Sequence, residues 1–148
     1  MTSRRIIGTT VVAFIVSQAL AIVVHGFILA ADYAPFYGTL LRPMPAEGEW
    51  RMLLLPLVHL CFVSGLVWVY SRIRIEGSAA AQGLKLGFVG WVVGQLPLWL
   101  LWNAEQPWPG SLVVKQLVLE LVSALIVGVT IALPARRSVA EPIWSAAG

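Results

Sequence analysis

Four long apolar runs constrain this chain more than any other feature, because each is long enough to cross a lipid bilayer as a helix. A transmembrane helix needs about 20 predominantly apolar residues. In lipid, backbone polar groups must be satisfied within the segment, which favours helices over open strands. We therefore predict an all-α fold, a four-helix transmembrane bundle that forms a single membrane domain over residues 1–148. The four spans are expected at about residues 6–33, 52–71, 84–104 and 111–133.

The composition agrees with a membrane protein. Hydrophobic residues make up 59% of the chain and charged residues only 11%, whereas soluble domains carry about 25% charged residues. The net charge of +3 comes from few basic residues, and these flank the apolar runs, so the expected partner is the lipid bilayer and not nucleic acid. The single cysteine, Cys61, excludes an internal disulfide and a Cys/His zinc pattern.

The distribution of basic residues predicts the orientation. Residues 34–51 contain three prolines and several charges, so we expect an extramembrane loop there, on the periplasmic side. Most Lys and Arg residues fall on the side of the two termini, and such residues concentrate on the cytoplasmic side of membranes. The expected order is up-down-up-down, with the N and C termini cytoplasmic. Arginines and lysines on the side of the termini are Arg4, Arg5, Arg72, Arg74, Lys85, Arg136 and Arg137. Those on the opposite side are Arg42 and Arg51, with Lys115 just inside the last span.

Small residues indicate where helices pack closely. Gly83, Gly87, Gly90 and Gly94 recur at helical spacing in the third span, and such small residues let a neighbouring backbone approach. They predict either packing within the chain or a dimer face, so a homo-oligomer or a larger membrane complex stays open. Two more glycines in the second and fourth spans, Gly65 and Gly128, are expected to add contact points.

One polar side chain from each helix is expected at a common depth. His25, His59, Gln95 and Glu120 each lie seven to nine residues from the same end of their span, which is roughly 10–14 Å at 1.5 Å of rise per residue. Polar residues inside a span are costly, so a matched set indicates a site or a packing device. Gln18 precedes His25 by seven residues, and Gln116 precedes Glu120 by four. The candidate ligand or proton site is therefore His25, His59, Gln95, Glu120, Gln18 and Gln116.

Several chemistries fit this polar layer, and the sequence leaves them open. The leading hypothesis is small-solute or proton handling without a cofactor, since a buried carboxylate beside histidine can exchange protons. The alternative is a metal bound by His25, His59 and Glu120, or a haem b with His25 and His59 as axial ligands. A third hypothesis is a structural or accessory membrane subunit whose polar layer fixes the helix register.

The sequence lacks the common catalytic motifs, and two charged residues lie near the ends of the spans. No nucleophile elbow, Walker loop, dinucleotide fingerprint or HExxH motif occurs, which favours a role other than catalysis, although a membrane enzyme using His59 and Glu120 stays open. Asp32 and Lys115 lie near the outer ends of the first and fourth spans. They could pair, or Lys115 could snorkel to water, and we favour snorkelling.

Several segments carry a resemblance to a known group of proteins. They are Leu57–Leu60, Trp68–Tyr70, Gln82–Phe88 and Gln106–Gln116. With about two thirds of the chain covered, the pattern resembles small bacterial four-helix inner-membrane proteins of uncharacterised activity. The resemblance implies a multi-pass protein of the bacterial inner (cytoplasmic) membrane, and it implies no activity.

Overall fold

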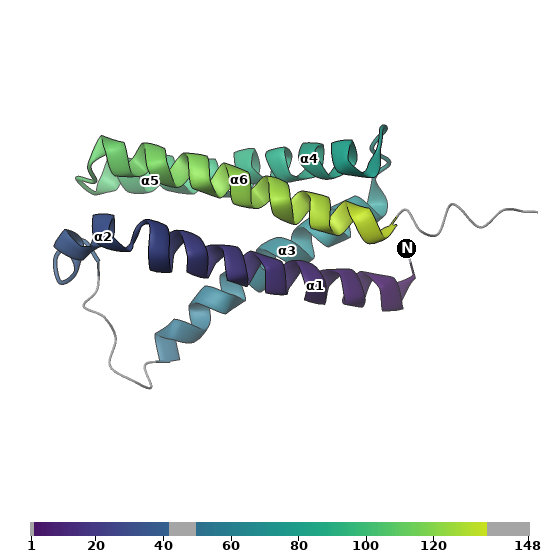
Figure 1. The fold of residues 1–148 in the computed structure, drawn as a ribbon, viewed down its shortest axis with the longest axis horizontal. Coiled ribbons are helices and arrows are strands. Elements are labelled where there is room, and N and C mark those ends of the chain that lie inside the picture. The colour runs from purple at the N-terminus through teal and green to yellow at the C-terminus, as the bar shows by residue number, and fades with distance from the viewer. Residues whose placement is uncertain (1, 42–49, 136–148) are drawn as a thin grey trace, which may run out of the picture.

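The computed structural model describes residues 2–41 and 50–135, and the elements in these ranges are helical (Figure 1). The first half contains α1 (Ser3–Ala21), η1 (Ile22–Ile28), α2 (Ala30–Tyr33), η2 (Ala34–Phe36), η3 (Trp50–Leu53) and α3 (Leu54–Arg72). The second half contains α4 (Ala79–Gly90), η4 (Trp91–Gln95), α5 (Leu96–Glu105) and α6 (Gly110–Ala135). Here η1 and η4 are π-helical, whereas η2 and η3 are short 3-10 turns.

Within the described residues, four helices are long and apolar enough to cross a membrane. They cover Ser3–Ile28, Leu54–Arg72, Ala79–Glu105 and Gly110–Pro134, so the prediction of an all-helical chain with four apolar spans is confirmed. Many large apolar side chains point outward, as a lipid-facing surface requires, and Phe27 is 74% exposed. A soluble protein rarely exposes so continuous an apolar surface.

The first span differs from the single helix predicted over residues 6–33. Its helical turns widen over Ile22–Ile28, where Leu29 N–H donates to the Val24 carbonyl, five residues earlier, at 2.9 Å. Leu29 then interrupts the helix, and the short α2 follows. Hydropathy does not detect this break because the apolar character continues through it.

The third span also widens, over Trp91–Gln95, between α4 and α5. Pro97 lies just after this segment, at the start of α5. A proline has no N–H to donate, and its ring excludes the carbonyl four residues earlier. The regular α-helical pattern is therefore interrupted here, and a wider turn takes its place.

Three glycines bring α4 and α6 into backbone contact. A Cβ atom added to Gly83 would meet the Val129 backbone, and one added to Gly87 would lie 2.8 Å from the Ala124 carbonyl carbon. A Cβ on Gly128 would lie 2.7 Å from the Gly87 nitrogen. Distances below 3.0 Å leave no room for a methyl group, so these glycines serve packing within the chain, one of the two predicted roles.

The other predicted contact glycines behave differently. Cβ atoms on Gly90 and Gly94 would meet side chains of α3, at 2.8 Å from Leu66 and 3.2 Å from Phe62 respectively. Gly65 has nothing within 4 Å of such an atom. The expectation of a contact point at Gly65 is wrong, because this residue lies on an exposed face of α3.

Two buried clusters flank the polar layer. The first joins all four spans, and the second joins the first and last spans with the segment before α6. Figure 1 shows why α3 is absent from the second: it crosses α1 obliquely, and its Leu54 end lies away from α6. The first cluster is Ala13, Val63, Leu66, Val67, Leu86, Val127 and Ile131, and the second is Val24, Leu29, Tyr33, Trp108, Leu112 and Val113.

The predicted loop over residues 34–51 is described in part. Its start turns back on itself, with Gly38 at a positive φ of 82°, and Phe36 packs edge-on against Trp108 with ring centroids 5.4 Å apart. Residues 42–49 lie outside the described part of the chain, and so do Arg136 and Arg137. The charges of these segments are therefore known from the sequence alone.

Candidate functional site

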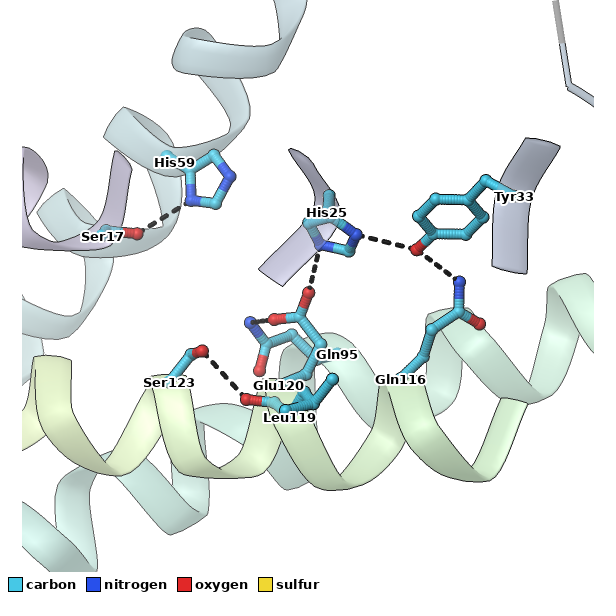
Figure 2. Close-up of polar contacts among 9 residues, drawn as sticks. All are labelled: Ser17, His25, Tyr33, His59, Gln95, Gln116, Leu119, Glu120 and Ser123. Carbon is cyan, nitrogen blue, oxygen red and sulfur yellow. Dashed lines mark hydrogen bonds and ion pairs between the residues drawn. The ribbon is translucent and has the colours of Figure 1, made fainter. Parts of the chain in front are cut away.

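Glu120 of α6 is the centre of the polar layer. Its Oε1 accepts a hydrogen bond from His25 Nε2 at 2.8 Å, and its Oε2 accepts one from Gln95 Nε2 at 2.9 Å (Figure 2). The Glu120 side chain is only 12% exposed, and that of His25 is 35% exposed. Three of the four residues predicted to share a depth are therefore in direct contact, and they come from three different spans.

The contacts continue beyond His25. Its Nδ1 lies 2.8 Å from the Tyr33 hydroxyl, which accepts a hydrogen bond from Gln116 Nε2 at 2.8 Å. Because this amide donates to the tyrosine oxygen, the Tyr33 O–H is left to donate to His25 Nδ1. The ring then carries its own hydrogen on Nε2 and donates to Glu120. In this order of donors, His25 is the Nε2–H tautomer and the Glu120 oxygen is the acceptor.

His59 belongs to a neighbouring group. Its Nδ1 lies 2.8 Å from the Ser17 hydroxyl, and Figure 2 shows this pair beside the Glu120 cluster without a hydrogen bond between the two. Instead, His59, Gln95 and Glu120 line a common cavity of about 10 Å³. That volume has room for about one water molecule. His59 thus faces the layer across a space of water size.

Gln18 and Lys115 lie outside the contacts described above. The buried Oε1 of Gln18 has no hydrogen-bond partner among the described residues, and none of the contacts described above involves this residue. Lys115 donates to both carboxylate oxygens of Asp32, at 2.8 and 2.9 Å. Of the two alternatives, the structure therefore shows the pair, because α2 carries the Asp32 carboxylate within reach of α6.

The wide turns aim two of the three contacting side chains. His25 lies inside η1, and Gln95 is the last residue of η4. A π-helical turn holds more residues than an α-helical one, so it rotates the side chains that follow relative to those before. Gln18 and His25, seven residues apart, therefore do not form the continuous stripe that a regular helix would give.

The residues do not fit a haem. Both ring nitrogens of His25 are engaged, by Tyr33 and by Glu120, and the cavity beside His59 is of water size. Within the described ranges, no three or more His, Cys, Asp or Glu side chains gather closely enough to hold a metal ion. A metal on His25, His59 and Glu120 gains no support from this geometry and stays a prediction for metal analysis.

Tyr33 and Ser17 are the partners that the sequence reasoning missed. Tyr33 ends the first predicted span, where an aromatic ring is typical of the membrane interface and does not by itself indicate a site. No regular helical spacing predicts its contact with His25, because the π-helical segment and the interruption at Leu29 lie between the two residues. The two rings stack with centroids 5.9 Å apart. Ser17 lies one residue before Gln18 and carried no signal of its own.

Comparison of the chain with family models, with curated proteins and with solved structures gave no match.

Proposed function

We propose that this chain is a multi-pass protein of the bacterial inner membrane that moves protons through the His25–Glu120 pair. In this proposal one membrane domain crosses four times, up-down-up-down, with both termini cytoplasmic. The bias of Lys and Arg toward the termini side supports that orientation. Figure 1 supports it as well, since the start of α1 and the end of α6 lie at the same end of the molecule.

The observation that carries the proposal is an unbroken series of hydrogen bonds from Gln116 through Tyr33 and His25 to Glu120. Imidazole suits proton transfer because it can accept a proton at one ring nitrogen and release another from the second. Here Nδ1 faces a hydroxyl donor and Nε2 faces a carboxylate acceptor.

The transfer balances atom by atom. The Tyr33 hydroxyl gives its proton to His25 Nδ1 while His25 Nε2 gives its proton to Glu120 Oε1. The imidazole ends neutral with its hydrogen on Nδ1, Glu120 becomes a carboxylic acid, and Tyr33 is left as a phenolate that takes a proton from water. Before the next transfer the ring returns to the Nε2–H form, by turning over or by exchanging its protons with water. Glu120 then passes its proton across the cavity that it shares with His59. On the other side of the His59 ring, Nδ1 forms a hydrogen bond with the Ser17 hydroxyl.

The size of the cavity favours protons over a solute. A space of about 10 Å³ beside Glu120 holds one water, and ordinary ligand pockets are about 300–1,000 Å³. A water between Glu120 and His59 is sufficient to relay a proton. Any larger solute would require the helices to separate.

The test is proton flux in sealed liposomes. The purified protein is reconstituted with a pH-sensitive dye inside, and a potassium gradient with valinomycin drives proton entry. We expect flux with the natural protein and a loss of at least about tenfold in Glu120→Gln. This amide keeps the size of the side chain and an oxygen to accept from His25, but it does not take up a proton at neutral pH.

A matched control separates this effect from general damage. Thr130→Val also replaces a polar group on α6, but Thr130 bonds only its own helix, at the Ile126 carbonyl, and we expect its flux to stay near that of the natural protein. Flux that is no higher than in empty liposomes would reject proton movement. In that case a drop in the stability of Glu120→Gln would favour the structural subunit.

A further inference from the structure

A second feature lies outside the polar layer, on the surface between the first and last spans. It is a groove of about 440 Å³ between the η1–α2 segment and α6. Five of its seven lining residues are aliphatic, among them Ile28 and Val118, and the other two are Asp32 and Lys115. The groove is therefore apolar along its walls and carries opposite charges.

The walls determine what fills this groove in a bilayer. A stable buried water needs two to four polar partners, and aliphatic walls offer none. Ile28 and Val118 are 52% and 55% exposed, so they face the surroundings of the helices. In a membrane those surroundings are acyl chains. The groove of about 440 Å³ is far larger than the cavity of about 10 Å³ beside His59, so an acyl chain can lie in it.

The two charges select a headgroup. Lys115 gives two hydrogen bonds to Asp32, and an ammonium has three N–H donors, so one donor is left for a phosphate oxygen. The carboxylate has about four acceptor sites, so it can also accept from a second ammonium. Both side chains remain accessible, with 54% of Lys115 and 33% of Asp32 exposed.

We propose that this groove binds one phospholipid with an ethanolamine headgroup, its phosphate on Lys115 and its ammonium on Asp32. A phosphoglycerol headgroup would meet Lys115 but leave a negative phosphate beside Asp32 without a cation to balance it. A choline headgroup has a cation but no N–H to donate. The ethanolamine headgroup supplies both groups and leaves the Asp32–Lys115 pair intact. The site goes beyond the proposed proton function and does not depend on it.

Native mass spectrometry of the detergent-purified, delipidated protein tests the site. Dioleoyl lipids with ethanolamine, choline or phosphoglycerol headgroups are added at equal concentration, and the bound lipids are counted. We expect one tightly bound ethanolamine lipid, preferred over the choline lipid by at least about tenfold, the effect of one hydrogen bond to a charged group. Equal binding of all three lipids, or tighter binding of phosphoglycerol, would overturn the proposal.

Three variants make the test specific. Asp32→Asn removes the partner of the ammonium and is expected to abolish the preference for ethanolamine over choline. Glu76→Gln makes the same acid-to-amide change outside the groove, at an exposed loop residue, and should keep the preference. Val118→Trp fills the groove and should lower the binding of all three lipids. A preference that survives in Asp32→Asn, or binding that survives in Val118→Trp, would refute the assignment.

Discussion

The contact between α4 and α6 predicts that Gly87→Ala destabilises the bundle. The new methyl group would lie 2.8 Å from both the Ala124 carbonyl carbon and the Leu125 Cα, whereas carbon atoms in contact lie about 3.5–4.0 Å apart. The two helices must therefore separate by about 1 Å at this point. The obstacle is backbone, so no change of side-chain rotamer can relieve it.

The size of the effect follows from two opposing terms. Overpacking a close contact costs about 1–3 kcal/mol, and a backbone obstacle places Gly87→Ala at the upper end. Alanine stabilises a helix by about 1 kcal/mol relative to glycine. The free energy of unfolding should therefore fall by about 2 kcal/mol in Gly87→Ala. Gly65→Ala is the matched control, because nothing lies within 4 Å of its added Cβ. In Gly65→Ala only the higher helix propensity of alanine acts, so the free energy of unfolding should rise by up to about 1 kcal/mol.

Reversible unfolding in mixed detergent micelles measures both variants. The natural protein in dodecylmaltoside is titrated with sodium dodecyl sulfate, and the fluorescence of its seven tryptophans reports unfolding. The two variants should differ by about 3 kcal/mol, roughly a hundredfold in the unfolding equilibrium constant. If Gly87→Ala proves as stable as Gly65→Ala, the close approach of α4 and α6 is wrong.

Two further measurements address the polar layer. Tyr33→Phe removes the hydroxyl between Gln116 and His25, so it should lower stability in the same micelle assay by about 1 kcal/mol and reduce proton flux as Glu120→Gln does; full flux would remove Tyr33 from the path. The purified protein should show no Soret band and no stoichiometric metal, since both nitrogens of His25 are engaged. A metal or haem that is lost in both His25→Ala and His59→Ala would establish a cofactor site and displace proton transfer by Tyr33.

The helices could be predicted because each apolar run is long and uninterrupted, and hydropathy reports that property directly. The common depth of Glu120, His25 and Gln95, which allows their contact, could also be predicted from the sequence. Matching depths follow from the rise per residue, and four helices leave few places for a polar group to find a partner. The close approach of another helix to the glycines of the third span also follows from their spacing, although the spacing does not say which helix approaches.

The details that were missed depend on where a helix stops being regular. A spacing of seven residues predicts one stripe for Gln18, His25 and Asp32 only if every turn is α-helical. The π-helical segment at Ile22–Ile28 and the interruption at Leu29 break that register. His25 therefore meets Glu120 and Asp32 meets Lys115, while Gln18 joins neither. No pattern of apolar residues records such a change.

The two wide turns also have a consequence for descendants of this sequence. Each π-helical turn contains more residues than the α-helical turn it replaces, so a one-residue deletion within Ile22–Ile28 would restore an ordinary helix without breaking the span. Every residue before the deletion would then turn by about 100° relative to those after it. The span would keep its length and apolar character, but residues before and after the deletion could not both keep their present contacts, and His25 would no longer face both Tyr33 and Glu120. In an alignment of relatives, a single gap in this segment or within Trp91–Gln95 should therefore mark lineages that kept the spans and lost the site.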